Sequence, residues 1–251
     1  MNGGKSTKRA LTGISGLDEL LGGGLPRGKI ILVCGGPGSG KTTLSTQFLY
    51  NGAREFDEPG VLVTFAESPD SIRENMSNRG FSLEELESQK KLKIIDLSRV
   101  LYLDPEDFHR NIVSGVRVHE FNIENAVVLI KKYVADLGAK RVVVDSVTSL
   151  SLHEQEWQKR RNVSHLFRCL FETGCTCVVT LEIRATTLER EFQIEEYLTE
   201  GVVLMQTLIK DNQLKRAISI EKMRGIAHDT QPRPYYLTAK GLEVFPQETV
   251  I

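Results

Sequence analysis

The stretch Gly35-Gly36-Pro37-Gly38-Ser39-Gly40-Lys41-Thr42 decides the fold of this chain. The apolar run Ile30-Ile31-Leu32-Val33 precedes it, and residues 43–49 follow it with a composition that suits a helix. Strand, turn and helix together match G-x-x-x-x-G-K-T, the phosphate-binding loop (P-loop). Its glycines let backbone N–H groups surround phosphate oxygens, and the N-terminus of the next helix attracts the same anion. A chance glycine loop is the alternative, but every fixed position of the motif is present. The sequence therefore predicts a nucleoside-triphosphate site.

The motif gives individual residues a role. We expect Lys41 to reach the β- and γ-phosphates and the Thr42 hydroxyl to ligate Mg²⁺. With ATP as the default nucleotide, the expected cofactors are ATP and Mg²⁺. The expected nucleotide contacts of the loop are Gly35, Gly36, Pro37, Gly38, Ser39, Gly40, Lys41, Thr42 and Thr43.

Composition sets broad limits on the class of protein. A chain of 251 residues can bury a large core, and 26% charged residues is ordinary for a globular protein. No apolar run approaches the roughly 18 residues of a membrane span, and no secretory signal pattern opens the chain. We therefore expect a cytoplasmic protein with no membrane partner. The formal net charge of −1 gives no general attraction to nucleic acid.

The four cysteines, at positions 34, 169, 175 and 177, are interpreted as small buried thiols. Cys175 and Cys177 could instead form a metal or redox pair. That alternative is weak, because no further His or Cys group stands at zinc-ligand spacing.

Apolar runs alternate with helix-compatible segments from about residue 29 to residue 183. The segments between the runs carry apolar residues at helical spacing. This order is typical of an α/β fold with a mostly parallel sheet and helices on both faces, here of the P-loop type. The expected strands after the first are residues 61–65, 92–95, 141–145 and 176–181.

The chain changes character after this alternation. Residues 202–209 and 214–223 flank Asp211-Asn212-Gln213 and predict an antiparallel hairpin, with a smaller hairpin around residues 238–241. Because no linker-like composition appears, we expect one domain over residues 12–251 after a flexible arm over residues 1–11.

Two local patterns complete the expected fold. Residues 98–121 show no regular pattern and are interpreted as an insertion or a long loop. Ser82, with Glu85 three residues later, predicts a capping box at the start of a short helix.

Two carboxylates follow buried strands and are expected at the carboxyl edge of the sheet, where ligands bind. Asp145 ends the run Val142-Val143-Val144 and is the candidate Walker B aspartate for Mg²⁺; a helix-capping aspartate is the alternative. Glu67 could polarise the water that attacks the γ-phosphate. Its alternative role is a favourable interaction with a helix N-terminus.

Two cations stand together near the end of the longer hairpin. Because side chains alternate along a strand, Lys222 and Arg224 project to the same side. With His228 shortly after them, they could sense phosphate, and an arginine offered to a neighbouring subunit's γ-phosphate is a known catalytic device. A solvated strand end is the competing interpretation.

Taken together, several stretches in order resemble the KaiC domain of the RecA superfamily of ATPases. The resemblance covers about residues 10 to 246 and is closest to single-domain relatives. Its motifs are Ile14-Ser15-Gly16-Leu17-Asp18, Gly23-Gly24-Leu25-Pro26, the P-loop, Thr64-Phe65-Ala66-Glu67-Ser68-Pro69, Val144-Asp145-Ser146, and Lys222-Met223-Arg224-Gly225 with His228.

The resemblance implies a RecA-like core that assembles into a homo-oligomeric ring, usually a hexamer, with ATP between subunits. Asp145 matches the family's Walker B aspartate. Lys222, Arg224 and His228 match residues that reach across the interface to the neighbour's nucleotide. Asn78 and Thr238 fall where the family also contacts nucleotide.

The chain departs from the family pattern at one position. The two-domain clock members carry two adjacent glutamates after this strand, and here Ala66 replaces the first. The pair Ala66-Glu67 instead resembles the Ala-Glu of RecA recombinases at the same place. The resemblance therefore assigns the water-activating role to Glu67 and implies slow hydrolysis.

Three functions are compatible with these observations. The first is a ring-forming, Mg²⁺-dependent ATPase whose hydrolysis switches subunit contacts or a protein partner. The second is a DNA-associated recombinase- or helicase-like accessory ATPase, but the loop over residues 184–195 is too acidic to favour a phosphate backbone. The third is a non-hydrolysing, ATP-gated scaffold, suggested by Ala66. Autophosphorylation on Ser or Thr follows only from the resemblance.

Overall fold

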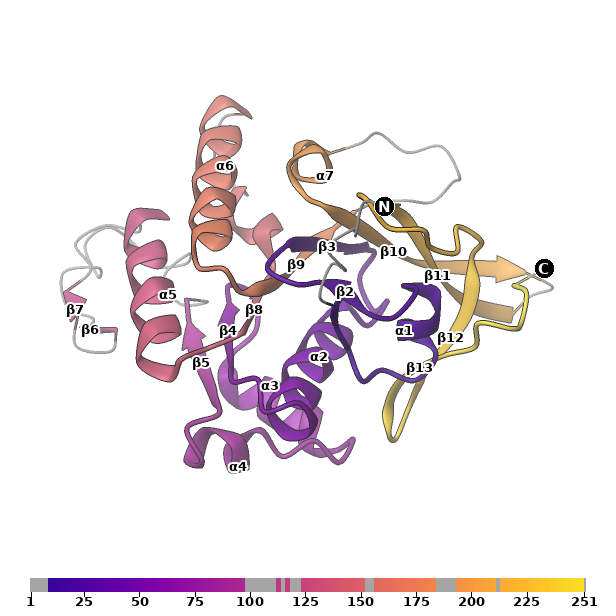
Figure 1. The fold of residues 1–251 in the computed structure, drawn as a ribbon, viewed down its shortest axis with the longest axis horizontal. Coiled ribbons are helices and arrows are strands. Elements are labelled where there is room, and N and C mark those ends of the chain that lie inside the picture. The colour runs from indigo at the N-terminus through magenta and orange to yellow at the C-terminus, as the bar shows by residue number, and fades with distance from the viewer. Residues whose placement is uncertain are drawn as a thin grey trace, which may run out of the picture.

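The structure is a computed structural model that describes residues 9–97, 112–113, 116–117, 123–151, 156–183, 193–210 and 213–250. Its centre is a nine-stranded sheet with the order β13-β12-β11-β10-β3-β9-β8-β4-β5 (Figure 1). Six of these strands run parallel, and the other three extend the sheet in antiparallel fashion. This confirms the predicted α/β class.

The six parallel strands are rich in Val, Ile and Leu, and their cores are buried on both faces of the sheet. Their register brings the carboxyl ends together, so that Gly35 lies opposite Glu182 and Thr64 lies opposite Asp145. The strands are β3 (Ile30–Gly35), β4 (Gly60–Thr64), β5 (Leu92–Asp96), β8 (Arg141–Asp145), β9 (Thr176–Glu182) and β10 (Gly201–Lys210).

The antiparallel extension contains the two predicted hairpins. β10 pairs with β11 (Gln213–Met223), and β12 (Arg233–Thr238) pairs with β13 (Gly241–Val244). The yellow C-terminal strands lie at one side of the molecule, far from α5 and α6 (Figure 1).

Helices cover both faces of the sheet (Figure 1). Two buried apolar clusters, one under each helical layer, form the core. None of the described helices is long and apolar enough to cross a membrane. One layer holds α1 (Leu17–Leu20), α2 (Lys41–Glu55), α3 (Pro69–Ser77) and α4 (Leu83–Ser88); the other holds α5 (Ile123–Leu137) and α6 (Glu156–Glu172).

The remaining elements are short. They are β1 (Arg9–Ala10), β2 (Leu25–Pro26), β6 (Ile112–Val113), β7 (Val116–Arg117), the 3₁₀ helix η3 (Val147–Ser151) and α7 (Ile194–Leu198). β6 and β7 fall inside the expected long loop, and the rest of residues 98–121 lies outside the described residues. All four cysteine thiols are buried, as their interpretation required.

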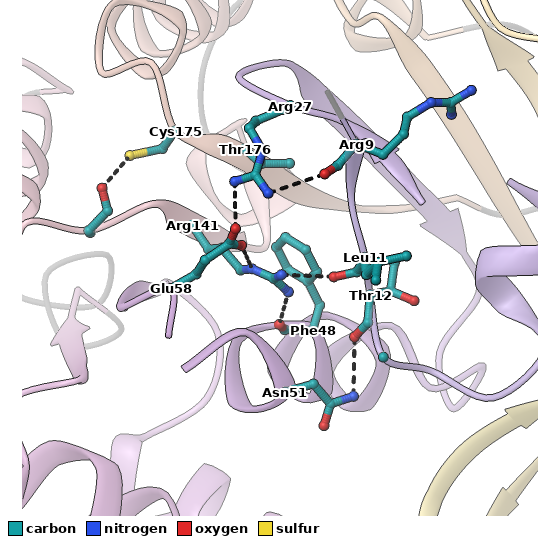
Figure 2. Close-up of polar contacts among 12 residues, drawn as sticks. Arg9, Leu11, Thr12, Arg27, Phe48, Asn51, Glu58, Arg141, Cys175 and Thr176 are labelled. Atoms are coloured by element: carbon teal, nitrogen blue, oxygen red, sulfur yellow. Dashed lines mark hydrogen bonds and ion pairs between the residues drawn. The ribbon is translucent and has the colours of Figure 1, made fainter. Parts of the chain in front are cut away.

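A buried polar network fastens the N-terminal segment to the sheet (Figure 2). Arg141, at the start of β8, donates to Glu58 Oε2 at 2.7 Å and to the carbonyl oxygens of Phe48 and Leu11 at 2.8 Å each. Arg27 binds the other oxygen of Glu58 at 2.5 Å. β1 pairs with β2, so residues 9 to 11, expected in a flexible arm, are instead held by these contacts. Residues 1–8 lie outside the described residues.

Candidate functional site

The P-loop joins the carboxyl end of β3 to the N-terminus of α2, the geometry that the motif predicts. Gly38 and Gly40 have φ angles of +72° and +94°, a left-handed conformation that favours glycine. A side chain at Gly38 would meet open space, so backbone conformation and not crowding requires glycine there. Gly40 is also crowded, because an added Cβ would lie 2.8 Å from Leu237.

Lys41, the first residue of α2, turns its ammonium back onto the loop. Its Nζ donates to the carbonyl oxygens of Gly35 and Gly36, at 2.9 Å each. Burial lowers the pKa of Lys41, while the carboxylates of Glu182 and Asp145 oppose that shift. Glu182 ends β9, and sequence reasoning did not consider it, although it follows a buried strand as Asp145 does.

Asp145 lies at the carboxyl end of β8 and contacts the P-loop directly. Thr42 Oγ1 donates to its Oδ2 at 2.6 Å, and the Thr180 hydroxyl on the neighbouring strand β9 donates to its Oδ1. The adjacent hydroxyl and carboxylate oxygens are the hard ligands that Mg²⁺ prefers, so the residues fit this ion. Sequence reasoning missed Thr180, because a threonine inside a buried strand gives no signal of its own.

A cavity of about 320 Å³ opens over the P-loop and brings Glu67 together with Lys41 and Thr42. Glu67 lies just after β4, and its Oε1 accepts from Ser71 Oγ at 2.5 Å and from Asn75 Nδ2 at 2.7 Å. The structure therefore brings these side chains together at one edge of the sheet, as predicted. The lining residues are Gly38, Gly40, Lys41, Thr42, Thr43, Glu67, Ile72, Asn75, Met76, Arg79 and Leu237.

β12 packs against the P-loop from the C-terminal side of the chain. The buried Tyr235 hydroxyl donates to the Ser39 carbonyl oxygen at 2.5 Å, and Leu237 contacts Gly40. Arg79, just after α3, donates to the Thr238 carbonyl oxygen at 2.8 Å. The far wall of the cavity is thus tied to the C-terminal hairpin.

Two expected nucleotide contacts lie beside the cavity and do not line it. Asn78 caps the C-terminus of α3, and the Thr238 hydroxyl bonds to the Gly241 carbonyl oxygen and to Glu243. Their sequence neighbours Arg79 and Leu237 line the cavity. The roles of Asn78 and Thr238 therefore stay predictions.

The candidate interface cations lie at the opposite edge of the sheet from the P-loop. Lys222 pairs with Val202, and Val202 pairs with Leu32 of β3. Because Leu32 precedes Gly35 on β3, Lys222 lies about 10 Å from Gly35 along the strand direction, toward the N-terminal ends of the parallel strands. Within the same chain neither Lys222 nor Arg224 belongs to the cavity over the P-loop. Both line a separate cavity of about 270 Å³ beside Tyr197.

Lys222 has a structural role in its own chain. Its Nζ donates to the carbonyl oxygens of Glu196 at 2.7 Å and Thr199 at 2.5 Å, at the C-terminal end of α7, where a cation is favourable. Burial, together with the nearby Arg224, lowers the pKa of Lys222.

Arg224 and His228 are held more loosely. Arg224 is exposed and makes one 3.3 Å bond to the Tyr197 carbonyl oxygen. The His228 ring lies 2.9 Å from the Ile226 carbonyl oxygen. Residues 184–192, most of the acidic loop considered for DNA, lie outside the described residues.

A parallel sheet, a P-loop at its carboxyl edge and an aspartate bound to the P-loop threonine define the class of P-loop nucleotide-binding α/β proteins. The KaiC ATPase family matches this chain over residues 10–249. A UPF0273 protein of Methanocaldococcus jannaschii is 35% identical, over 97% of this chain and 98% of its own length.

Two further relatives are informative. The circadian clock oscillator protein KaiC of Synechococcus elongatus is 37% identical over 94% of this chain, which spans 44% of that protein. The crystal structure of a KaiC-like protein from Pyrococcus horikoshii has a TM-score of 0.81 at 34% identity, and the match covers 96% of this chain and 100% of that one. The chain therefore belongs to the KaiC family of ATPases within the RecA superfamily. It corresponds to a single KaiC-type domain, as the resemblance predicted.

Proposed function

We propose that this chain hydrolyses ATP with Mg²⁺, at a site that a neighbouring copy completes in a ring. One observation carries the proposal. A single cavity brings together the P-loop lysine, the P-loop threonine and Glu67, and Asp145 is bonded to that threonine. Phosphoryl transfer needs these parts: a cradle for the phosphates, a metal-associated carboxylate and a group that orients water.

Residues of this chain meet each of these three requirements. The backbone N–H groups of the P-loop and the α2 N-terminus bind the phosphates, and the Lys41 ammonium leaves its two carbonyl partners to bind the β- and γ-phosphates. Thr42 and Asp145 would hold Mg²⁺, which would supply positive charge against the charge that develops on the phosphates. Glu67 accepts a hydrogen bond from the attacking water and directs it at the γ-phosphate.

The neighbouring copy supplies the missing cations. Since Arg224 lies at the far edge of the sheet and is exposed, it is placed to reach another chain's γ-phosphate and not its own. Lys222 lies at that edge, and both Lys222 and His228 join the contact as the family resemblance implies. A hexamer is the proposed ring, by the same resemblance.

Two other functions remain as outcomes of the test. A non-hydrolysing scaffold is favoured by Ala66, which leaves Glu67 as the lone glutamate at the end of β4. Tight ATP binding without phosphate release would identify it. Stimulation by single-stranded DNA, with a steep dependence on salt, would identify the DNA-associated alternative.

The test is steady-state phosphate release with ATP and Mg²⁺, on protein of known oligomeric state. Lys41→Ala and Glu67→Gln are each expected to lower the rate by at least about 100-fold, because each removes charge or base chemistry needed in the transition state. Glu67→Gln should keep ATP binding within a few-fold, and Glu74→Gln, on the exposed side of α3, should keep the wild-type rate. A Glu67→Gln variant as fast as the wild type would contradict the assignment of the base.

A further inference from the structure

Two side chains of α3 hold the carboxylate of Glu67. The Ser71 hydroxyl donates to Oε1 at 2.5 Å, and the Asn75 amide donates to the same oxygen at 2.7 Å. The Asn75 amide nitrogen also lies 3.5 Å from the Ser71 hydroxyl oxygen. Both donors therefore converge on one oxygen of the glutamate.

The local sequence explains why these donors meet there. Residues 67, 71 and 75 are four apart, so Ser71 and Asn75 occupy successive turns on one side of α3. Ser68 caps that helix by accepting from the Ser71 backbone N–H at 3.3 Å. On the other side, the Thr64 hydroxyl donates to the Glu67 carbonyl oxygen at 2.6 Å. The Glu67 backbone is thus fixed by β4, and its carboxylate is fixed by α3.

This arrangement leaves the second carboxylate oxygen available. Among the described residues none donates to Glu67 Oε2, while Oε1 accepts two bonds. A free glutamate carboxylate rotates over a broad range about its last torsion. A base acts efficiently only when it is held at a fixed position, and an error of about 1 Å can cost on the order of 100-fold in rate.

We infer that Ser71 and Asn75 are positioning residues for hydrolysis: they fix the plane of the Glu67 carboxylate so that Oε2 faces the attacking water. The inference rests on the proposed function, because it assumes that Glu67 orients water. The competing interpretation is that both side chains only stabilise α3. The two interpretations make different predictions for catalysis.

Steady-state kinetics of the full chain with ATP and Mg²⁺ test the inference. Ser71→Ala and Asn75→Ala should each lower kcat about fivefold, and the double variant on the order of 30-fold, with KM within about twofold of the wild type. Ser71→Thr keeps the hydroxyl and should restore most of the rate.

Asn75→Asp separates positioning from helix stability. Aspartate keeps the shape of asparagine but removes the donor and places a negative charge beside Glu67, so its kcat should fall below that of Asn75→Ala. If Asn75 only stabilises α3, alanine, the better helix former, leaves kcat unchanged.

Ser77→Ala is the matched control, since it makes the same chemical change at the exposed end of the same helix. It should keep the wild-type kcat. If the wild type hydrolyses ATP and the Ser71 and Asn75 variants match Ser77→Ala, or change only KM, the inference is overturned and the proposed function stands. If the wild-type ring releases no phosphate, both are overturned.

Discussion

The guanidinium of Arg141 joins three segments that are far apart in the sequence. It is fully buried, it lies 4.4 Å over the Phe48 ring of α2, and its partners come from α2, the loop before β4 and the N-terminal segment. Gly52 on α2 leaves room for it, because an added Cβ would collide with the arginine side chain. A buried charge of this kind is tolerated only when its hydrogen bonds are satisfied.

We therefore expect Arg141→Met to lower the free energy of unfolding by about 3 kcal/mol, because it leaves the buried Glu58 without one of its two cations. Arg27→Met removes the other cation, whose side chain is 39% exposed, and should cost about 1 kcal/mol or less. Urea unfolding of both variants measures the difference. Equal losses would contradict the view that the buried arginine carries the network (Figure 2).

The roles of some individual residues could be predicted from the sequence, and those of others could not. Asp145 could be predicted because a carboxylate that follows Val142-Val143-Val144 has few other uses. Arg141 begins the same strand, yet its role could not be predicted, because its partners are brought together only by the fold. Ser71 and Asn75 gave no signal either, since polar residues on a helix are usually solvated.

At the scale of elements, the strand–loop–helix unit and the alternation of strands with helices were predictable, because they follow from local periodicity. The capping box expected at Ser82 was wrong: the Ser82 side chain makes no cap hydrogen bond. A capping box forms instead at Gln193 and Glu196 of α7. The Ser-x-x-Glu pattern alone therefore does not determine where a capping box forms.

The contact between β12 and the P-loop joins residues 196 positions apart, and only the structure reveals it. Burial raises the pKa of the Tyr235 phenol, so the hydroxyl stays a donor to the Ser39 carbonyl oxygen. The hydrogen bond from β12 to the P-loop is therefore kept above the pH at which a free phenol ionises.

This contact predicts a pH dependence of stability. Above about pH 10 the unfolded chain loses the Tyr235 proton while the folded chain keeps it. The unfolded state then binds fewer protons, so the free energy of unfolding falls as pH rises. The wild type should lose up to about 1.4 kcal/mol per pH unit more than Tyr235→Phe in this range.

Denaturant unfolding between pH 9 and pH 11 measures this slope. Tyr236→Phe is the matched control on the same strand, since the Tyr236 side chain is 54% exposed. It should keep the wild-type slope. A Tyr235→Phe protein with the wild-type slope would show that the buried phenol does not titrate differently on folding.

At the scale of the whole molecule, the sheet separates two halves of the proposed site. The P-loop and Glu67 lie at the carboxyl edge of the parallel strands, and Lys222 and Arg224 lie at the other edge, on the antiparallel extension. An interface between two different edges of the same chain is heterologous, and repetition of such an interface forms a ring when the rotation between neighbours closes. β11 and β12 connect the halves, since β11 carries Lys222 and ends one residue before Arg224, and β12 contacts the P-loop.

Mixed rings test this arrangement directly. Lys41→Ala lacks a working P-loop but keeps Arg224, and Arg224→Ala lacks the cation but keeps its P-loop. Each variant alone should be nearly inactive. In a random one-to-one mixture after subunit exchange, about one interface in four pairs an intact P-loop with an intact Arg224, so about a quarter of the wild-type phosphate release should return.

A second mixture serves as the control. Lys41 and Glu67 line the same cavity of one chain, so Lys41→Ala mixed with Glu67→Gln leaves no interface complete: every Lys41→Ala cavity lacks its lysine and every Glu67→Gln cavity lacks its base. That mixture should remain inactive in rings of the same size. If Arg224 acted within its own chain, the first mixture would remain as inactive as the second. Recovery in the first mixture alone would therefore locate Arg224 on the far side of the proposed subunit interface.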